Sequence, residues 1–212
     1  MDVRRFVDAG ALAEAAAVAV ADAASRAMAA RGRFVIALSG GATPRATYAR
    51  LAEPPWRDRI DWSRAIVLFG DERCVPADSP DSNAGMAGAT LVDRLPPGHR
   101  PQVVEVDGTI TPDEAARRYQ AAVAAALGVA PDGPPPAIDL VLLGLGTDGH
   151  TASLFPGSAA LDDRVRWFAP ARAPVAPTDR VTATPPLLAA AREILFLVGG
   201  LGKRAALDAA LD

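Results

Sequence analysis

The sequence predicts an α/β protein with a mainly parallel sheet and helices on both faces of that sheet. Short runs of consecutive apolar residues recur along the chain, as in strands that are buried on both faces. Segments with helical spacing and helix-capping residues separate these runs. Hydrophobic residues make up 50% of the 212 residues and charged residues 22%, which is enough apolar material for a substantial core.

The first helix and strand are indicated by an alanine-rich stretch and the apolar run that follows it. Residues 8–31 have apolar side chains near helical spacing, and Gly32 ends this predicted helix. Residues 34–38 are apolar throughout and predict a buried strand. A Ser-Gly-Gly turn follows, and the next helix is expected to begin at Pro44 with Thr43 as its cap.

A second strand and helix follow the same pattern. Residues 65–69 are as apolar as the first strand, and Gly-Asp-Glu-Arg follows directly at 70–73. A loop rich in Pro, Asp and Ser leads to a helix expected over residues 82–95. Residues 103–106 are a weaker strand candidate.

The alternation continues in the second half of the chain. Thr-Pro-Asp-Glu at 111–114 is a capping box with proline at the first helical position, and it opens a helix that extends to Leu127. The proline-rich segment 131–136 is interpreted as a connector, so we expect one domain over residues 1–212. Apolar runs follow at 138–143 and 194–198, and between them, after a weaker region, Arg-Val-Thr-Ala-Thr at 180–184 is a further strand candidate. A final helix is expected from near Leu201.

Charge and cysteine content exclude several classes of partner. The net charge is −3, so no global positive field would attract nucleic acid or anionic lipid. The one cysteine, Cys74, allows no intrachain disulfide and favours a reducing compartment. We read neither a signal peptide nor a membrane span in the sequence. These features predict a cytoplasmic protein with no nucleic-acid or membrane partner.

Polar and glycine-rich segments follow several predicted strands, at the edge where ligands bind in open α/β sheets. Residues 39–44, Ser-Gly-Gly-Ala-Thr-Pro, lie between a strand and a helix. The two glycines allow close approach of the backbone to a ligand, and the helix start offers free N–H groups. This segment is a candidate phosphate cradle or, with similar weight, an ordinary tight turn.

A second glycine-rich segment presents the best candidate for proton transfer. Residues 144–149 match the G-x-G-x-x-G pattern, but Pro156-Gly157 interrupts where a dinucleotide-binding fold needs a long helix. We therefore interpret the segment as a loop that presents Asp148 and His150. A histidine can accept and return a proton near neutral pH, and a carboxylate can orient it. The alternative is a structural histidine that caps the loop.

The remaining candidates are charged residues at strand and helix ends. Arg73, in Asp71-Glu72-Arg73, offers donors for phosphate or carboxylate, or else forms a surface ion pair. Lys203 is the only lysine and stands near the start of the last helix. A catalytic role for Cys74 would need a histidine partner. His99 is interpreted as a solvated loop residue, and with no cysteine pair the sequence predicts no metal site and no cofactor.

Taken together, these segments resemble the 6-phosphogluconolactonase family in order and spacing over essentially the whole chain. The resemblance rests on Ser39 to Pro44, Phe69 to Pro76, Asp81-Ser82-Asn83, Arg180-Val181-Thr182, Gly199 to Lys203 and, most specifically, Gly144 to Gly157. It implies a modified Rossmann-like fold shared with glucosamine-6-phosphate deaminase and ribose-5-phosphate isomerase. It also implies hydrolysis of 6-phospho-D-glucono-1,5-lactone, a small sugar-phosphate partner, in the oxidative pentose phosphate pathway.

By the same resemblance, His150 oriented by Asp148 would be the acid/base. The residues expected to hold phosphate and substrate are Ser39, Gly40, Gly41, Thr43, Asp71, Arg73, Asn83, Arg180 and Lys203. The family usually continues beyond the helix at Lys203 with another strand and helix, so the chain is expected to be short at the C-terminus. We expect a monomer.

Two alternatives stay open at the level of sequence. A glucosamine-6-phosphate deaminase resembles this family but carries an acidic residue shortly after the Gly-His pair, where residues 151–156 have none. A non-catalytic sugar-phosphate-binding module would need an output domain, and no helix-turn-helix or basic segment is present.

Overall fold

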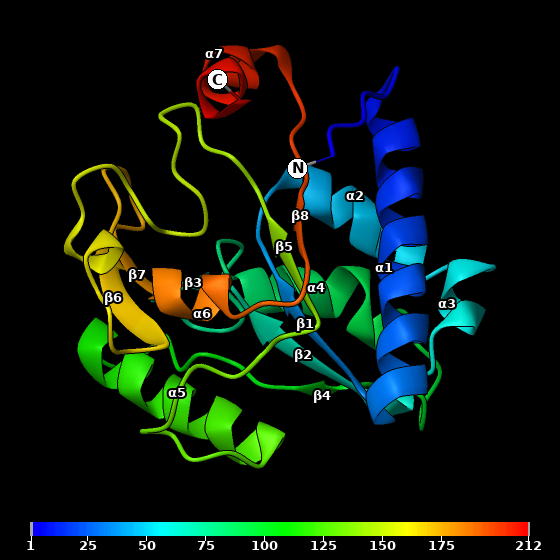
Figure 1. Ribbon diagram of the computed structural model, residues 1–212, viewed down its shortest axis with the longest axis horizontal. Helices are drawn as coiled ribbons and strands as arrows, with labels where there is room; N and C mark the ends of the chain where they lie inside the picture. The colour runs from blue at the N-terminus through cyan, green and yellow to red at the C-terminus, as the bar shows by residue number, and fades with distance from the viewer. Residues whose placement is uncertain (1, 212) are drawn as a thin grey trace.

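A computed structural model describes residues 2–211, and its main sheet has five parallel strands (Figure 1). The strands lie in the order β4 (Gln102–Val103), β2 (Ala65–Phe69), β1 (Phe34–Leu38), β5 (Leu140–Leu143) and β8 (Ile194–Phe196). Every pairing in this sheet is parallel. The predicted mainly parallel sheet is therefore confirmed.

Helices cover both faces of the main sheet. One face packs against α1 (Ala9–Arg31), α2 (Ala42–Leu51), α3 (Trp56–Arg59) and α4 (Asn83–Thr90), and the other against α5 (Pro112–Leu127) and α6 (Pro185–Ala189). In β1, Phe34, Ile36 and Leu38 face the first group, while Val35 and Ala37 face the second. This alternation explains why the central strands are apolar throughout.

The C-terminal helix and four short 3₁₀ helices complete the helical elements. The helix is α7 (Arg204–Leu211), and the 3₁₀ helices are η1 (Trp62–Arg64), η2 (Val92–Arg94), η3 (Ala159–Leu161) and η4 (Leu201–Lys203). No helix within residues 2–211 has the length and apolar character that a membrane crossing requires.

A second, antiparallel sheet of three strands packs beside α5. It consists of β3 (Asp71–Arg73), β7 (Asp179–Ala183) and β6 (Phe168–Arg172), with β7 in the middle. In the β3–β7 pair, Arg73 lies opposite Arg180. The sequence indicated β7 but neither β3 nor β6, because β3 is short and charged and β6 contains a proline, Pro170.

Several predicted boundaries were wrong by a few residues. Helix α2 begins at Ala42 rather than Pro44, and its cap is Gly41 rather than Thr43, because the chain turns at Gly41 with φ of 107°. Thr111 stands at the N-cap of α5 as predicted, but its side chain makes no capping hydrogen bond. The strand expected at 103–106 is reduced to the two residues of β4, and α4 ends at Thr90.

Candidate active site

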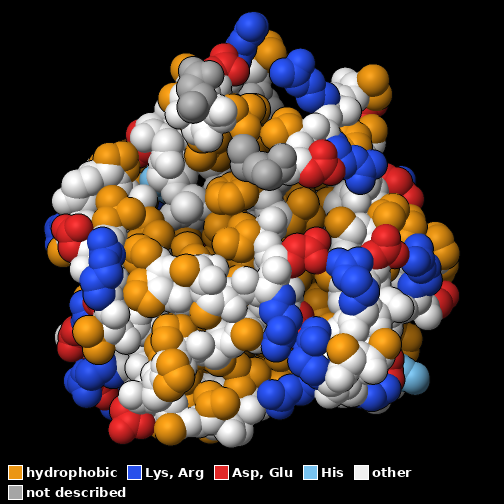
Figure 2. Space-filling model, viewed as in Figure 1, with side chains coloured by type: hydrophobic (Ala, Val, Ile, Leu, Met, Phe, Trp, Pro, Cys, Tyr) orange, Lys and Arg blue, Asp and Glu red, His pale blue; other side chains and the backbone are white. Residues whose placement is uncertain are grey.

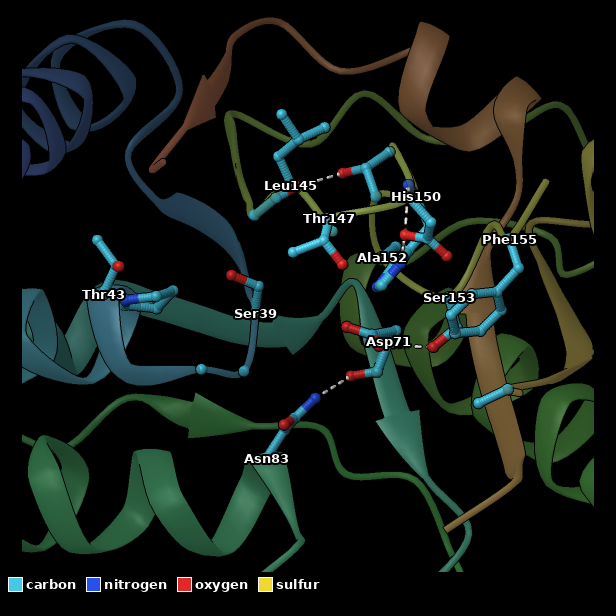
Figure 3. Close-up of a pocket in the computed structure, with 18 of the residues that line it drawn as sticks. Ser39, Thr43, Asp71, Asn83, Leu145, Thr147, His150, Ala152, Ser153 and Phe155 are labelled. Atoms are coloured by element: carbon cyan, nitrogen blue, oxygen red, sulfur yellow. Dashed lines mark hydrogen bonds and ion pairs between the residues drawn. The ribbon is translucent and has the colours of Figure 1, made fainter. Parts of the chain in front are cut away.

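A cavity of about 620 Å³ lies at the carboxyl edge of the main sheet, where the loops after β1, β5 and β8 meet β3 and β7. Figure 3 shows Ser39 and Thr43 on one side of the view and His150 and Phe155 on the other. The residues that the resemblance assigns to proton transfer and to substrate binding all line this cavity: Ser39, Gly40, Gly41, Thr43, Asp71, Arg73, Asn83, Asp148, His150, Arg180 and Lys203. The residues that follow β1, β2, β5 and β8 converge because parallel strands end at one edge, and Arg180 joins them through the antiparallel pairing of β7 with β3.

His150 and Asp148 form a hydrogen-bonded pair in the loop after β5. The distance between His150 Nδ1 and Asp148 Oδ1 is 2.6 Å, and the two side chains are 31% and 43% exposed. Burial raises the pKa of Asp148, but its hydrogen bonds with His150 outweigh that effect and lower it overall. A carboxylate at this position fixes the tautomer with hydrogen on Nδ1, which leaves Nε2 able to accept a proton.

The loop around this pair is tightly closed on itself. Gly146 N–H donates to the His150 carbonyl at 2.7 Å, and Thr151 Oγ1 donates to the Gly144 carbonyl at 2.8 Å. The Phe155 ring packs against the imidazole with 4.4 Å between ring centroids. A side-chain carbon at Gly146 would lie 2.1 Å from His150 Nδ1, so only glycine leaves room for the histidine.

The Ser-Gly-Gly segment forms a loop with free donors at the start of α2. Within residues 2–211, the N–H groups of Gly40 and Gly41 have no hydrogen-bond partner. Ser39 Oγ is buried beside them and is also unpartnered. The first N–H groups of α2 have no intrahelical partner either, and the helix dipole is positive at this end. Residues Ser39, Gly40 and Gly41, called the anion loop below, are therefore suited to binding an anion.

Three cationic side chains line the same cavity without a carboxylate partner. Among the described residues, Arg73, Arg180 and Lys203 form no ion pair, and the Nε atoms of both arginines are buried without a hydrogen bond. Burial and the adjacent Arg73 charge lower the pKa of Arg180, although nearby carboxylates oppose this. Two close, incompletely compensated guanidinium groups favour binding of an anion.

Asp71 is held in place by two residues from other parts of the chain. Ser153 Oγ donates to Asp71 Oδ2 at 2.7 Å, and Asn83 Nδ2 donates to the Asp71 carbonyl at 2.8 Å (Figure 3). The Asn83 side chain also contacts the anion loop, because a side-chain carbon at Gly40 would lie 2.1 Å from Asn83 Oδ1. The sequence did not single out Ser153, since nothing in its spacing indicates contact with Asp71.

Glu72, next to Asp71, has a structural role. It is buried and accepts the backbone N–H groups of Arg73, Asn83 and Ala84, at 2.7, 2.8 and 2.7 Å. Burial raises the pKa of Glu72, and the three N–H groups oppose that rise. The carboxylate thus caps α4 and joins it to β3, which fixes Asn83 beside Asp71.

Other candidates considered from the sequence lie outside any reactive arrangement. Burial, together with Asp179 and Glu72, raises the pKa of the Cys74 thiol to about 11, so the thiol is not activated. His99 is exposed, as expected. No group of three or more potential metal-binding side chains occurs within residues 2–211. On the face in Figure 2, basic side chains are interspersed with acidic and apolar ones.

Comparison with known proteins identifies similar sequences. Residues 7–212 match the family model described as glucosamine-6-phosphate isomerases/6-phosphogluconolactonase. A 6-phosphogluconolactonase of Nostoc sp. is 40% identical over 84% of this chain and 71% of its own length. A probable chloroplastic 6-phosphogluconolactonase of rice is 34% identical over 95% of this chain, which spans 63% of the rice protein's length.

Solved structures agree with these similarities. The 6-phosphogluconolactonase of Trypanosoma brucei has a TM-score of 0.81 and 32% identity, over 98% of this chain and 85% of that chain. A monomeric glucosamine-6-phosphate deaminase matches with a TM-score of 0.77 but 21% identity, which shows a shared fold alone. The predicted relation of the fold to the deaminases is confirmed.

Proposed function

The chain belongs to the glucosamine-6-phosphate isomerase/6-phosphogluconolactonase family, and we propose that it hydrolyses 6-phospho-D-glucono-1,5-lactone to 6-phospho-D-gluconate. The observation that carries the proposal is the Asp148–His150 pair in one cavity with Arg73 and Arg180, whose charges have no carboxylate partner among the described residues. A group able to take a proton from water thus shares a cavity with groups able to hold a phosphate.

In the proposed mechanism, His150 acts first as a base and then as an acid. Its Nε2 removes a proton from water as the water oxygen attacks the lactone carbonyl carbon, and a tetrahedral oxyanion forms. The bond to the ring oxygen then breaks, and the ring oxygen takes the proton back from the imidazolium. Asp148 holds Nδ1 and stabilises the imidazolium, and the free loop N–H groups or an arginine stabilise the oxyanion.

The phosphate would be held by the anion loop and by three cationic side chains that form no ion pair within residues 2–211. Ser39, Gly40 and Gly41 offer hydroxyl and N–H donors, and Arg73, Arg180 and Lys203 offer positive charge. A δ-lactone is an activated ester, so this reaction needs no covalent nucleophile. Binding energy from the distant phosphate can therefore supply much of the orientation that speeds the attack.

The two alternatives receive less support from the site. A deaminase needs a further carboxylate for proton transfer during ring opening, and residues 151–156 contain no acidic side chain. A binding module would have no use for an oriented base, whereas His150 is held by Asp148 and covered by Phe155. The monomeric state and the cytoplasmic location stay predictions.

The test is an assay of lactone loss with purified protein, corrected for spontaneous hydrolysis. We expect strong acceleration for the 6-phosphorylated lactone and a much smaller effect on glucono-1,5-lactone. Loss of the phosphorylated lactone at the spontaneous rate would refute the proposal. Ammonia release from glucosamine 6-phosphate, measured in parallel, would instead support a deaminase.

A further inference from the structure

The chain contains two tyrosines, Tyr48 and Tyr119, and each one binds the backbone at the end of a central strand. We infer that Tyr48 is a positioning residue for the anion site: its hydroxyl fixes Ser39 and thereby holds the N–H groups of Gly40 and Gly41 in a binding arrangement. This inference deepens the proposed function and rests on it for the identity of the phosphate ester.

The Tyr48 hydroxyl closes the anion loop from within. Tyr48 lies in α2, nine residues after Ser39, and its side chain is fully buried. Its Oη accepts the Ser39 N–H at 2.9 Å and donates to the Ser39 carbonyl at 2.8 Å. Burial raises the pKa of the phenol, so the hydroxyl stays protonated and makes both bonds.

Ser39 depends on this hydroxyl because it lies just beyond the sheet. Strand β1 ends at Leu38, whose carbonyl accepts the Gly70 N–H at 2.8 Å. Within residues 2–211, both backbone hydrogen bonds of Ser39 go to Tyr48. Without the hydroxyl, a buried N–H and a buried carbonyl would lose their partner, and the chain before Gly40 would move to recover one.

Tyr119 supplies a matched control from the opposite face of the sheet. It lies in α5, is also buried, and its hydroxyl accepts the Phe69 N–H at 2.6 Å and donates to the Phe69 carbonyl at 3.2 Å. The chain at the end of β2 is secured in other ways, because Gly70 also bonds to Leu38 and to Ala183. The two tyrosines therefore make the same bonds, but only Tyr48 adjoins the anion loop.

The experiment compares Tyr48→Phe with Tyr119→Phe in the full chain. Both variants should lose comparable stability in denaturant unfolding, because each removes one buried hydroxyl. The Kd for inorganic phosphate, measured by calorimetry, should rise roughly tenfold in Tyr48→Phe and stay within about twofold in Tyr119→Phe. For the phosphorylated lactone, Tyr48→Phe should raise KM with little change in kcat. Equal phosphate affinity in the wild type and Tyr48→Phe, or equal weakening in both variants, would overturn the inference.

A second measurement uses the unmutated sequence, in case Tyr48→Phe does not fold. Protein that carries 3-fluorotyrosine should give two ¹⁹F resonances, assigned with Tyr119→Phe. Saturation with inorganic phosphate should shift the Tyr48 resonance and leave the Tyr119 resonance in place. An unmoved Tyr48 resonance at saturation would contradict the inference. If the wild type binds phosphate but does not hydrolyse the lactone, the proposed function is wrong. The phosphate Kd and the ¹⁹F shift would still test whether Tyr48 positions the anion loop.

Discussion

Replacing Gly146 with alanine should separate His150 from Asp148 without removing either side chain. The added carbon would lie 2.1 Å from His150 Nδ1 and 2.4 Å from Asp148 Oδ1, whereas carbon contacts favour about 3.5–4.0 Å. Both side chains must therefore move away from residue 146, each by about 1 Å or more. A shift of that size would lengthen a hydrogen bond of 2.6 Å beyond its useful range.

We expect Gly146→Ala to reduce kcat by about 10²-fold, the lower end of the range for general acid–base catalysis. That loss corresponds to about 2.7 kcal/mol in the activation barrier. Binding of 6-phosphogluconate, measured by calorimetry, should change little, because the proposed phosphate ligands lie on other segments. The loss should come from orientation, so the variant should unfold close to the wild-type denaturant midpoint.

Gly144→Ala is the matched control in the same loop. A side-chain carbon at Gly144 would meet no heavy atom of the described residues within 4 Å, so this variant should keep kcat within about threefold. The kinetic comparison uses the lactone assay corrected for spontaneous hydrolysis. Wild-type kcat in Gly146→Ala, or equal losses in the two variants, would refute the assignment of this pair to proton transfer.

Three further predictions concern the phosphate ligands, metal and thiol. Arg73→Ala and Lys203→Ala should each weaken phosphate-ester binding by about 1.5–3 kcal/mol. If both variants discriminate between the phosphorylated and the unphosphorylated lactone as the wild type does, the phosphate binds at another site. Dialysis against a chelator should preserve activity, and a loss that zinc restores would contradict a metal-free mechanism. Burial and acidic neighbours raise the pKa of Cys74 to about 11, so its thiolate forms only at high pH. Cys74→Ala should therefore keep wild-type kcat at pH 7, and a folded but inactive variant would contradict this prediction.

The central strands could be predicted from the sequence because burial on both faces leaves a local signal. Residues 34–38 and 65–69 are apolar at every position, and both runs are strands in the structure. Strand β3 carries no such signal, since Asp71-Glu72-Arg73 is charged and becomes a strand only by pairing with β7, more than a hundred residues away. Pairing at that distance depends on tertiary structure.

The residues that line the cavity could be predicted from the sequence, but the contacts between them could not. Polar residues after parallel strands must meet at one edge of the sheet, which explains why most of the named candidates share a cavity. Arg180 is different, because it reaches the cavity from the antiparallel strand β7. The contacts that orient them are not local in sequence: Ser153 reaches Asp71 across 82 positions. The hydrogen bonds from the two tyrosines to the strand ends could not be predicted from the sequence either. A tyrosine on a helix is equally expected to fill an ordinary core, and only the packed structure shows its partner.

The most direct test of the proposed mechanism is the turnover of His150→Ala relative to its binding of product. The imidazole is held by Asp148 and packed by Phe155, so its removal should take away proton transfer and leave the anion loop intact. We predict that kcat, corrected for spontaneous hydrolysis, falls by about 10²–10⁴-fold relative to the wild type. Binding of 6-phosphogluconate should be retained. A folded His150→Ala protein that binds product and turns over lactone near the wild-type rate would contradict the account.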